Sequence, residues 1–395
     1  MEKVYIVAGA RTAIGAFGGS LKDVPPAKLG ATVVAEAVRR AGIEPAEVQH
    51  VVLGQVIQSS AKDAYLARVV AIEAGIPVEA PALTLNRLCG SGLQAIISAA
   101  QMIALGECDI AIGGGAESMS RSPHIVTDAR FGKKMGSITM SDALLDVLSD
   151  PFDGCHMGVT AENVARDYNI SRDRQDELAA QSQARAARAK AEGRFKDQIV
   201  AVEVKDRKAT RWFDEDEFVR ADASLEEMAK LKPAFAKDGT VTPGNASGIN
   251  DGAAALVLAS EKAVSERKLA PIARILGWGH AGVEPNVMGI GPVKAVPIAL
   301  RRAGLSLGQI DVIESNEAFA AQAAAVAREL GFDPEKVNPN GSGIALGHPV
   351  GATGAIITVK AMYELQRIGG RYALITMCIG GGQGIAMVIE RCEFI

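Results

Sequence analysis

Cysteine is scarce in this sequence, and the few cysteines are widely spaced. The chain has 395 residues and five cysteines, none at the close paired spacing of a zinc knuckle. An odd number without such pairs also argues against a disulfide framework. We therefore expect free thiols, no metal site and a reducing, cytoplasmic location. The cysteines are Cys89, Cys108, Cys155, Cys378 and Cys392.

The sequence also has little net charge and no long apolar run. The formal net charge is -4, and no block of Lys or Arg dominates, so nucleic acid and anionic membranes are not expected as main partners. The apolar run at residues 4–10 is too short for a signal peptide, and no run approaches the ~20 apolar residues of a membrane span. Hydrophobic residues make up 48% of the chain, so it can bury large cores.

What the sequence does contain is internal similarity at a spacing of about 260 residues. Chance can supply one similar pair of segments, but three pairs in the same order indicate a duplicated unit. Each half alternates apolar strands with amphipathic helices, which predicts a layered α/β architecture of two halves around a pseudo-twofold axis. The pairs are residues 37–43 with 299–305, 95–98 with 355–358, and 112–115 with 379–382.

The stretch between the repeats differs in character and is interpreted as an inserted loop domain. It spans residues 119–249 and is rich in Met, Gly and charge. Within it, Ser171 can cap a mostly solvated helix that ends before Gly193. Long insertions of this kind commonly form substrate-binding lids or subunit contacts. The predicted domains are 1–118 with 250–270, 119–249, and 271–395.

Cys89 is the first candidate nucleophile, because it lies between a strand-like and a helix-like segment. The small residues 90–92 leave its sulfur uncovered, and the apolar spacing from Leu93 onward predicts a helix. A helix N-terminus carries partial positive charge, which favours a thiolate by lowering a thiol pKa from roughly 8.5. The alternative is that Cys89 is a small buried hydrophobic residue.

His348 is the candidate base, and the repeat places it near Cys89. It lies in a glycine-rich segment, residues 341–354, that precedes the predicted helix at Ala355. The pseudo-twofold axis then brings His348 and Cys89 to one centre. A Cys beside a His can be activated for acyl transfer, since the imidazole takes the thiol proton.

Two further polar residues follow apolar strands of the second half. Asn316 falls at the repeat position of Gly54, and Cys378 at that of Ala111. The fold needs neither polar side chain, so function accounts better for both. A second Cys suits carbon–carbon bond formation, which needs a base for a proton alpha to a carbonyl.

Donors for a developing oxyanion are also present. Backbone N–H groups at Cys89 and Gly380 can point at a thioester oxygen, and His348 with Asn316 can polarise a second one. Each such donor is worth roughly 3 kcal/mol of barrier.

These motifs resemble the thiolase family, most closely its bacterial biosynthetic acetyl-CoA acetyltransferases, from residue 4 to nearly the C-terminus. The resemblance implies an α/β thiolase fold: duplicated βαβαβαββ halves in five αβαβα layers with an inserted loop domain. It also implies a homotetramer. The matching segments are those around Cys89, Asn316-Glu317-Ala318-Phe319, Gly347-His348-Pro349 and Cys378-Ile379-Gly380-Gly381-Gly382.

The resemblance implies a role for each reactive residue. Cys89 would carry the acyl group, with His348 as its activator. Cys378 would deprotonate the attacking acetyl-CoA. Asn316 would hold a water that forms one oxyanion hole with His348, and the amides of Cys89 and Gly380 would form the other. The reaction condenses two acetyl-CoA to acetoacetyl-CoA and CoA, without a cofactor.

The resemblance also assigns contacts with CoA or the acyl group. From the residues alone, His156 equally fits a structural histidine, Ser247 a turn former, and Met157 and Met288 core fillers. Arg220 is the natural partner for a phosphate or the adenine. The predicted contacts are His156, Met157, Arg220, Ser247, Met288, Ala318 and Phe319.

Two departures from the common thiolase pattern are visible, and three alternative functions compete with the resemblance. Residues 340–344 read NGSGI where NGGAI is commoner, and Pro243 precedes the Gly244 segment. A dehydrogenase is disfavoured because residues 113–117 lack the G-x-G-x-x-G spacing. A non-catalytic acyl-CoA-binding relative would have little reason to keep both cysteines and the histidine. The third alternative is a degradative 3-ketoacyl-CoA thiolase that accepts longer chains.

Overall fold

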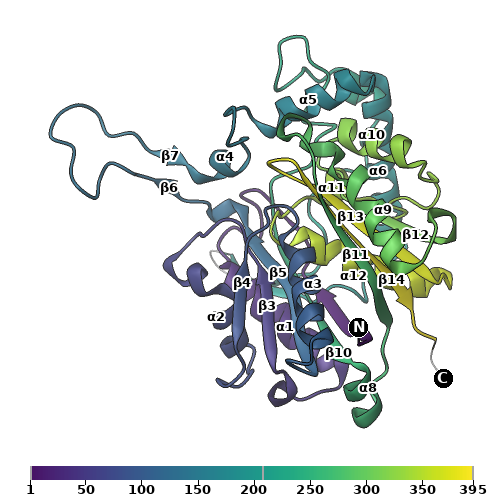
Figure 1. Cartoon of the computed structure of the whole chain (residues 1–395). Coiled ribbons are helices and arrows are strands. Elements are labelled where there is room, and N and C mark those ends of the chain that lie inside the picture. Colours follow the sequence, from purple (N-terminus) through teal and green to yellow (C-terminus); the bar gives the residue numbers. More distant parts are fainter. Residues whose placement is uncertain (1, 207–208, 394–395) are drawn as a thin grey trace.

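The structure, a computed structural model, describes residues 2–206 and 209–393 (Figure 1). Its first stretch contains β1 (Val4–Arg11), β2 (Gly15–Ala16), α1 (Pro26–Ala41), β3 (His50–Gly54), α2 (Leu66–Glu73), β4 (Ala82–Leu85), α3 (Ser91–Ala104) and β5 (Ile110–Ser118). The middle stretch contains β6 (His124–Ile125), β7 (Ser141–Asp142), α4 (Ala143–Val147), α5 (Met157–Asp167), α6 (Arg172–Ala191), β8 (Val202–Asp206), β9 (Ala209–Phe213) and α7 (Leu225–Ala229).

The last stretch completes both halves of the molecule. It contains β10 (Asn250–Ser260), α8 (Glu261–Arg267), β11 (Ala273–Gly282), α9 (Gly291–Ala303), β12 (Val312–Ser315), α10 (Ala320–Leu330), α11 (Gly343–Leu346), α12 (Thr353–Ile368), β13 (Tyr372–Ile379) and β14 (Gln383–Arg391). Short 3-10 helices are η1 (Pro45–Glu47), η2 (Ala61–Tyr65), η3 (Met119–Arg121), η4 (Pro285–Ile290) and η5 (Leu307–Gln309).

The strands and helices form five layers, as the resemblance to thiolases implies. The strands run in the order β12-β13-β14-β11-β1-β10-β5-β3-β4, and β1 joins the two halves by pairing with β11. Helices α1 and α2 cover the outer side of the first half, and α9 and α10 cover that of the second. Helices α3 and α12 pack between the halves in a shared apolar core. The predicted αβαβα arrangement of two similar halves is therefore confirmed.

Helices α1 and α9 confirm the first repeated pair. Each has a proline in its first turn, where no intrahelical N–H is needed, and two arginines in its last turn. Each ends at a glycine in the left-handed conformation, Gly42 with φ 68° and Gly304 with φ 69°. A strand of the sheet follows both helices.

The paired glycine runs, in contrast, are not equivalent. Residues 112–115 lie inside β5, whereas residues 380–382 form the turn between β13 and β14, with φ of 80° at Gly381 and 88° at Gly382. The β5 run needs glycine for another reason, since a side chain at Gly113 would collide with α3. The two similar glycine runs therefore have different structural roles: close packing against α3 in the first half and a tight turn in the second.

The predicted equivalence of Cys378 and Ala111 is also wrong, because the two residues lie at different places in their strands. Ala111 is the second residue of β5, whereas Cys378 is the last but one of β13. The other predicted equivalence is confirmed, because Gly54 ends β3 and Asn316 directly follows β12.

The third strand of the second half is reduced to a single bridge. Ile313 pairs with Val337 in the parallel direction, where the first half has the full strand β4. Asn338 takes a left-handed φ of 46°, and Pro339 follows it. The chain therefore turns away before a longer ladder can form.

Helix α6 is less solvated than the sequence suggests. Ser171 caps it as predicted by accepting a hydrogen bond from the Arg174 N–H at 3.2 Å. Ala179, Ala186 and Ala189 are fully buried, and the helix packs against α10 and α11. The small alanines allow this close approach. In the sequence, the charged residues around them suggest a solvated helix instead.

The loop between β6 and β7 extends away from the body as a long arm (Figure 1). Phe131 is 96% exposed and Met135 87% exposed within it. Among the described residues, no helix has both the length and the apolar character to cross a membrane.

Helices α3 and α12 approach each other closely at two glycines. A Cβ atom at Gly92 would lie 2.8 Å from the Ala355 backbone nitrogen, and one at Gly354 would collide with the Leu93 backbone. The two glycines occupy matching places in the first turns of the two helices. This contact therefore holds together the loops that precede α3 and α12, which carry Cys89 and His348.

We predict that Gly92→Ala destabilises the fold, because a methyl group there must push α12 away from α3. The expected loss is about 1 to 3 kcal/mol in the free energy of unfolding, measured by urea denaturation. Gly308→Ala is the matched control, since a Cβ atom at Gly308 has nothing within 4 Å. Equal stability of the two variants would contradict the proposed close packing.

Candidate active site

One small pocket between the two halves collects most of the predicted site residues. Its volume is about 60 Å³. Nine of the twelve predicted residues line it: Cys89, His156, Met157, Ser247, Met288, Ala318, Phe319, His348 and Gly380. Asn316 and Cys378 are buried close by, whereas Arg220 lies elsewhere.

A tight turn between β4 and α3 presents Cys89 to this pocket. Leu88 has a left-handed φ of 46°, which is costly for a bulky side chain. Asn86 Oδ1 accepts a hydrogen bond from the Leu88 N–H at 2.8 Å. The Ser91 hydroxyl donates to the Leu88 carbonyl and accepts from the Arg87 N–H. These bonds hold a strained turn at the position where Cys89 meets the pocket.

The Cys89 thiol is protonated at rest. Burial raises its pKa to about 11, although the backbone N–H groups of Gly380 and Cys89 itself favour the thiolate. The position at a helix N-terminus predicts a thiolate, but desolvation outweighs that effect here. Cys89 therefore needs a base before it can act as a nucleophile.

His348 has the protonation state that such a base needs. Its Nδ1 lies 2.7 Å from the Thr353 hydroxyl, which donates its own proton to the Pro349 carbonyl at 2.9 Å. Thr353 thus accepts from Nδ1–H, and Nε2 is left as a proton acceptor. Burial lowers the His348 pKa to about 4, so the imidazole is neutral at pH 7. The Asn250 side chain fixes the loop by accepting the His348 N–H at 2.9 Å.

Asn316 directs its amide nitrogen at the same imidazole. Its Nδ2 lies 3.4 Å from His348 Nε2, and the side chain is fully buried. Asn316 Oδ1 accepts no hydrogen bond from the described part of the chain. Asn316 Nδ2 and His348 Nε2 therefore lie next to each other beside the pocket.

Cys378 lies in the apolar wall behind Cys89. It is 1% exposed and clusters with Met157, Met288 and Phe319, which line the pocket. Burial, and to a lesser extent the negative charge that Cys89 carries when it is ionised, raises the Cys378 pKa far above its usual range. Cys378 is therefore also a neutral thiol at rest.

His156 combines the two roles that the sequence left open. Its Nδ1 accepts the Gly158 N–H at 3.0 Å and so caps α5. Its ring stacks on Phe235 with centroids 4.7 Å apart, and Phe235 meets Phe319 edge to face at 6.2 Å. The cap thus fixes an aromatic wall of the pocket.

Arg220 does not line the pocket. Its side chain is exposed, and its guanidinium lies 5.3 Å from the centre of the Phe218 ring. Its backbone N–H donates to Gln183 Oε1 at 2.8 Å. The expected contact between Arg220 and CoA stays a prediction.

Glu117 is a buried residue near the site that sequence reasoning missed. Its carboxylate accepts the backbone N–H groups of Val56 and Ile57 from one half and of Gly351 from the other. Burial raises its pKa to about 8 against these hydrogen bonds. Glu117 thereby ties a pocket-lining loop of the first half to the His348 loop.

Thr353 and Asn250 were missed as well. The sequence offers a weak signal for Thr353, a hydroxyl five residues after His348 at a helix start. Asn250 lies 98 residues from His348 in the sequence, so only the folded chain reveals their contact.

Comparison with known proteins identifies the family. The Thiolase, N-terminal domain model matches residues 4–262, and the Thiolase, C-terminal domain model matches residues 269–391. The chain is 61% identical to beta-ketothiolase BktB of Cupriavidus necator over 99% of both chains. It is 51% identical to an acetyl-CoA acetyltransferase of Chromobacterium violaceum, covering 98% of this chain and all of the relative.

Solved structures agree with these matches. The crystal structure of the Bacillus anthracis acetyl-CoA acetyltransferase aligns with a TM-score of 0.97 at 47% identity, covering 99% of each chain. Human mitochondrial 3-ketoacyl-CoA thiolase in complex with CoA aligns with a TM-score of 0.97 at 46% identity, over 99% of this chain and 98% of that one. The dehydrogenase alternative is thereby excluded, and the chain belongs to the thiolase family.

Proposed function

We propose that this protein is an acetyl-CoA C-acetyltransferase, which condenses two acetyl-CoA to acetoacetyl-CoA and CoA through an acetyl-Cys89 intermediate. The observation that carries the proposal is the meeting of a thiol, a neutral imidazole and a second buried thiol around one pocket. Relatives that are about half identical carry the name acetyl-CoA acetyltransferase. The reaction is reversible and needs no cofactor, since CoA thioesters are the substrates.

In the first half-reaction, His348 Nε2 takes the proton of Cys89, and the thiolate attacks the acetyl carbonyl. The N–H groups of Gly380 and Cys89 already point at the sulfur, so they lie where they can stabilise the tetrahedral oxyanion. The C–S bond to CoA then breaks, and the departing sulfur takes the proton of Cys378. Acetyl-Cys89, protonated His348 and a Cys378 thiolate remain.

In the second half-reaction, Cys378 removes an alpha proton from the second acetyl-CoA. Protonated His348 and Asn316, through a bound water, donate hydrogen bonds to the enolate oxygen. The alpha carbon attacks acetyl-Cys89, the Cys89–acyl bond breaks, and the released thiolate recovers its proton from His348. Burial makes both thiols weak acids at rest, so each is ionised only as a partner takes its proton.

Met157 and Met288 set the room available for the acyl chain. Both line the pocket and are buried, at 6% and 3% exposure. Each excluded methylene is worth roughly 1 kcal/mol, so two such side chains discriminate against long chains. A broader 3-ketoacyl-CoA thiolase remains the second candidate function, because a 61% identical relative is named a beta-ketothiolase.

The remaining predicted contacts fit the same proposal. The wall that would contact CoA is formed by four pocket-lining residues: His156, Ser247, Ala318 and Phe319. Arg220 lies outside the pocket, with its side chain exposed. We propose that the inserted segment, residues 119–249, contributes His156 and Ser247 to this wall and also the contacts between subunits.

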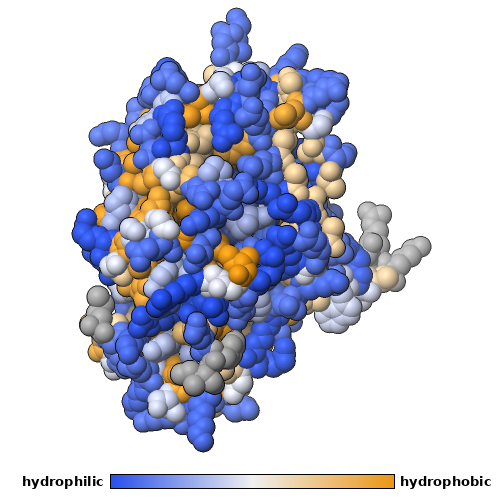
Figure 2. Space-filling model, turned by 90° about the vertical axis from the view of Figure 1, so that its right-hand side faces the viewer, coloured by the Kyte–Doolittle hydropathy of each residue, from blue (hydrophilic) through white to orange (hydrophobic). Residues whose placement is uncertain are grey.

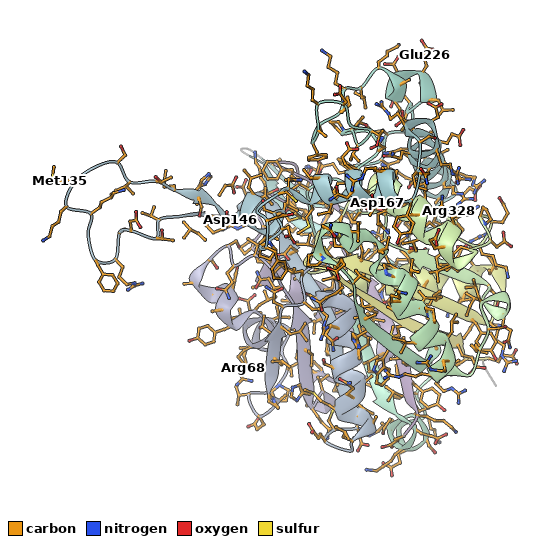
Figure 3. All side chains as sticks on the ribbon, turned by 45° about the horizontal axis from the view of Figure 1, so that its top comes forward. Arg68, Met135, Asp146, Asp167, Glu226 and Arg328 are labelled. Atoms are coloured by element: carbon orange, nitrogen blue, oxygen red, sulfur yellow. The ribbon has the colours of Figure 1, made fainter. Side chains whose placement is uncertain are left out.

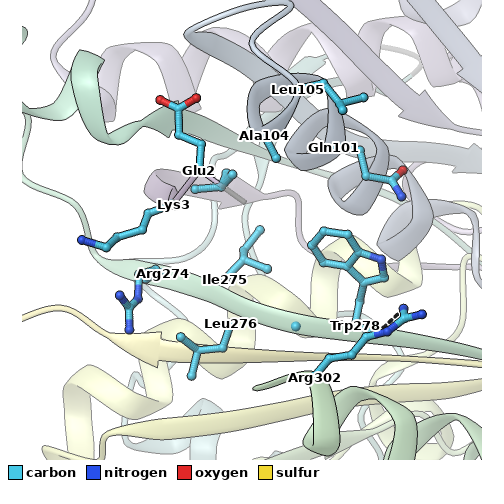
Figure 4. A pocket seen from close by; sticks show the side chains of 12 residues that line it. Glu2, Lys3, Gln101, Ala104, Leu105, Arg274, Ile275, Leu276, Trp278 and Arg302 are labelled. Carbon is cyan, nitrogen blue, oxygen red and sulfur yellow. Dashed lines mark hydrogen bonds between the residues drawn. The ribbon is translucent and has the colours of Figure 1, made fainter. Parts of the chain in front are cut away.

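We also propose a homotetramer. The arm between β6 and β7 carries exposed Met135 at its tip (Figures 1 and 3). An open groove of about 940 Å³ lies between the end of α3, at Leu105, and Trp278 of β11 (Figure 4). The face opposite the arm is mostly hydrophilic, with apolar residues gathered along one side (Figure 2). Cytoplasmic location stays a prediction.

The two half-reactions make separable demands on the two cysteines. Cys378→Ser should accumulate acetyl on Cys89, which peptide mass mapping can locate. The same variant should lose condensation by a factor of roughly 100 or more and slow the exchange of labelled CoA with acetyl-CoA much less, because a CoA thiolate can leave without the Cys378 proton, whereas the alpha proton cannot be removed without a base. Cys89→Ser is the control and should lose both. An acetyl group on another residue would refute the intermediate.

Chain-length discrimination can be tested at Met288. Met288→Ala should raise activity on 3-ketohexanoyl-CoA relative to acetoacetyl-CoA by about tenfold, because the truncated side chain opens the wall. The measurement is the ratio of kcat/KM values in the cleavage direction. An unchanged ratio, with good wild-type activity on the longer substrate, would favour the broader thiolase instead.

The protonation states predict an unusual pH profile. A His with an ordinary pKa near 6.5 loses its base function below that pH, but burial lowers the His348 pKa to about 4. The rate of CoA exchange should therefore stay nearly constant down to about pH 5 and fall only below it. Circular dichroism at each pH checks that the protein stays folded. An acidic limb centred near pH 6.5 would contradict a neutral buried imidazole.

A further inference from the structure

A second, much smaller cavity lies behind Asn316, on the side of α12. Its volume is about 10 Å³, which is at the lower limit of the roughly 10–15 Å³ that one water molecule needs. The lining is polar enough to hold water, because Asn316, Ser342, Thr353 and Lys360 all contribute to it.

Lys360 brings a charged group to this cavity. It is 1% exposed on α12, and its Nζ donates to Glu314 Oε2 at 2.7 Å and to the Gly341 carbonyl at 2.6 Å. An ammonium group has three N–H donors, so these two bonds leave one proton. Glu314 and Asn316 are two residues apart at the end of β12, which places their side chains on the face that meets α12.

Asn316 brings an acceptor to the same cavity. Its Oδ1 is buried, and no hydrogen bond from the described residues reaches it. A Cβ atom at Gly343, which also lines the cavity, would lie 2.8 Å from Oδ1, so this atom points to the cavity side. An unsatisfied buried oxygen is energetically costly, which favours a partner there.

We propose that this cavity holds one ordered water, which accepts a hydrogen bond from Lys360 Nζ and donates one to Asn316 Oδ1. The second water proton can reach the hydroxyl oxygen of Ser342 or Thr353, since both residues line the cavity. The water thereby has three partners, the usual number for a buried water.

The consequence concerns the orientation of the Asn316 amide. With Oδ1 held on the cavity side, Nδ2 faces His348 and the pocket, where it acts as a donor. A flipped amide would instead turn an acceptor toward the bound water that contacts the enolate oxygen. Lys360 is therefore a positioning residue that acts through the water on Asn316. This inference rests on the proposed role of Asn316 in condensation.

A crystal structure that resolves ordered waters tests the site directly. We expect electron density for one water within hydrogen-bonding distance of both Lys360 Nζ and Asn316 Oδ1. A dry cavity, or a water that contacts only one of these atoms, would overturn the proposal.

Kinetics test the positioning role. Lys360→Met alone leaves Glu314 as an unpaired buried carboxylate and endangers folding. We therefore compare the double variant Glu314→Gln with Lys360→Met against Glu314→Gln alone. The double variant should lose condensation by about tenfold, while CoA exchange changes less than about twofold. A structural role would reduce both reactions equally, and that result would overturn the proposal.

The Asn316→Ala background separates this inference from the proposed function. There the Lys360 change should cost no further condensation, because the residue it positions is gone. An additive loss would show that Lys360 acts by another route and would overturn the proposal. If Asn316→Ala itself spares condensation, the proposed role of Asn316 fails, together with the positioning role of Lys360.

Discussion

The close crossing of α3 and α12 is the constraint on which the candidate site depends. At Gly92 and Gly354, the backbone of each helix occupies the space that a side chain would need. Cys89 and His348 precede these helices by only a few residues, so the helix contact sets the distance between their loops. Glu117 then fixes the loops further by accepting N–H groups from both halves. The relative position of Cys89 and His348 therefore depends on having glycine, without a Cβ atom, at positions 92 and 354.

Burial determines the chemistry of the reactive groups once they are placed. It raises the pKa of both thiols and lowers that of His348, so all three are neutral at rest. No separated charge has to be stabilised in the apolar pocket before substrate arrives. In the proposed reaction, charge would develop only as a proton moves between neighbouring groups, and fixed N–H donors such as that of Gly380 are already in place for it.

The sequence predicts the layered fold well, because helix ends such as Gly42 and Gly304 repeat with the same chemistry. The pocket residues also follow from the motifs. Two kinds of feature escape prediction. Similar glycine runs have different uses, since Gly113 packs against a helix and Gly381 makes a turn. Partners such as Thr353 depend on tertiary contacts, and the burial that overrides a helix dipole at Cys89 is a property of the folded state.

The duplication leaves one further trace. The offset that relates Gly92 to Gly354 also relates Cys89 to Gly351 and Asn316 to Gly54. A side chain at Gly351 would collide with Glu117, and one at Gly54 with Ser91. At these positions the two halves pack alike but have room for a single candidate site. Each half supplies groups where the other half supplies space, so a second set of side chains at Gly351 and Gly54 would have to displace Glu117 and Ser91.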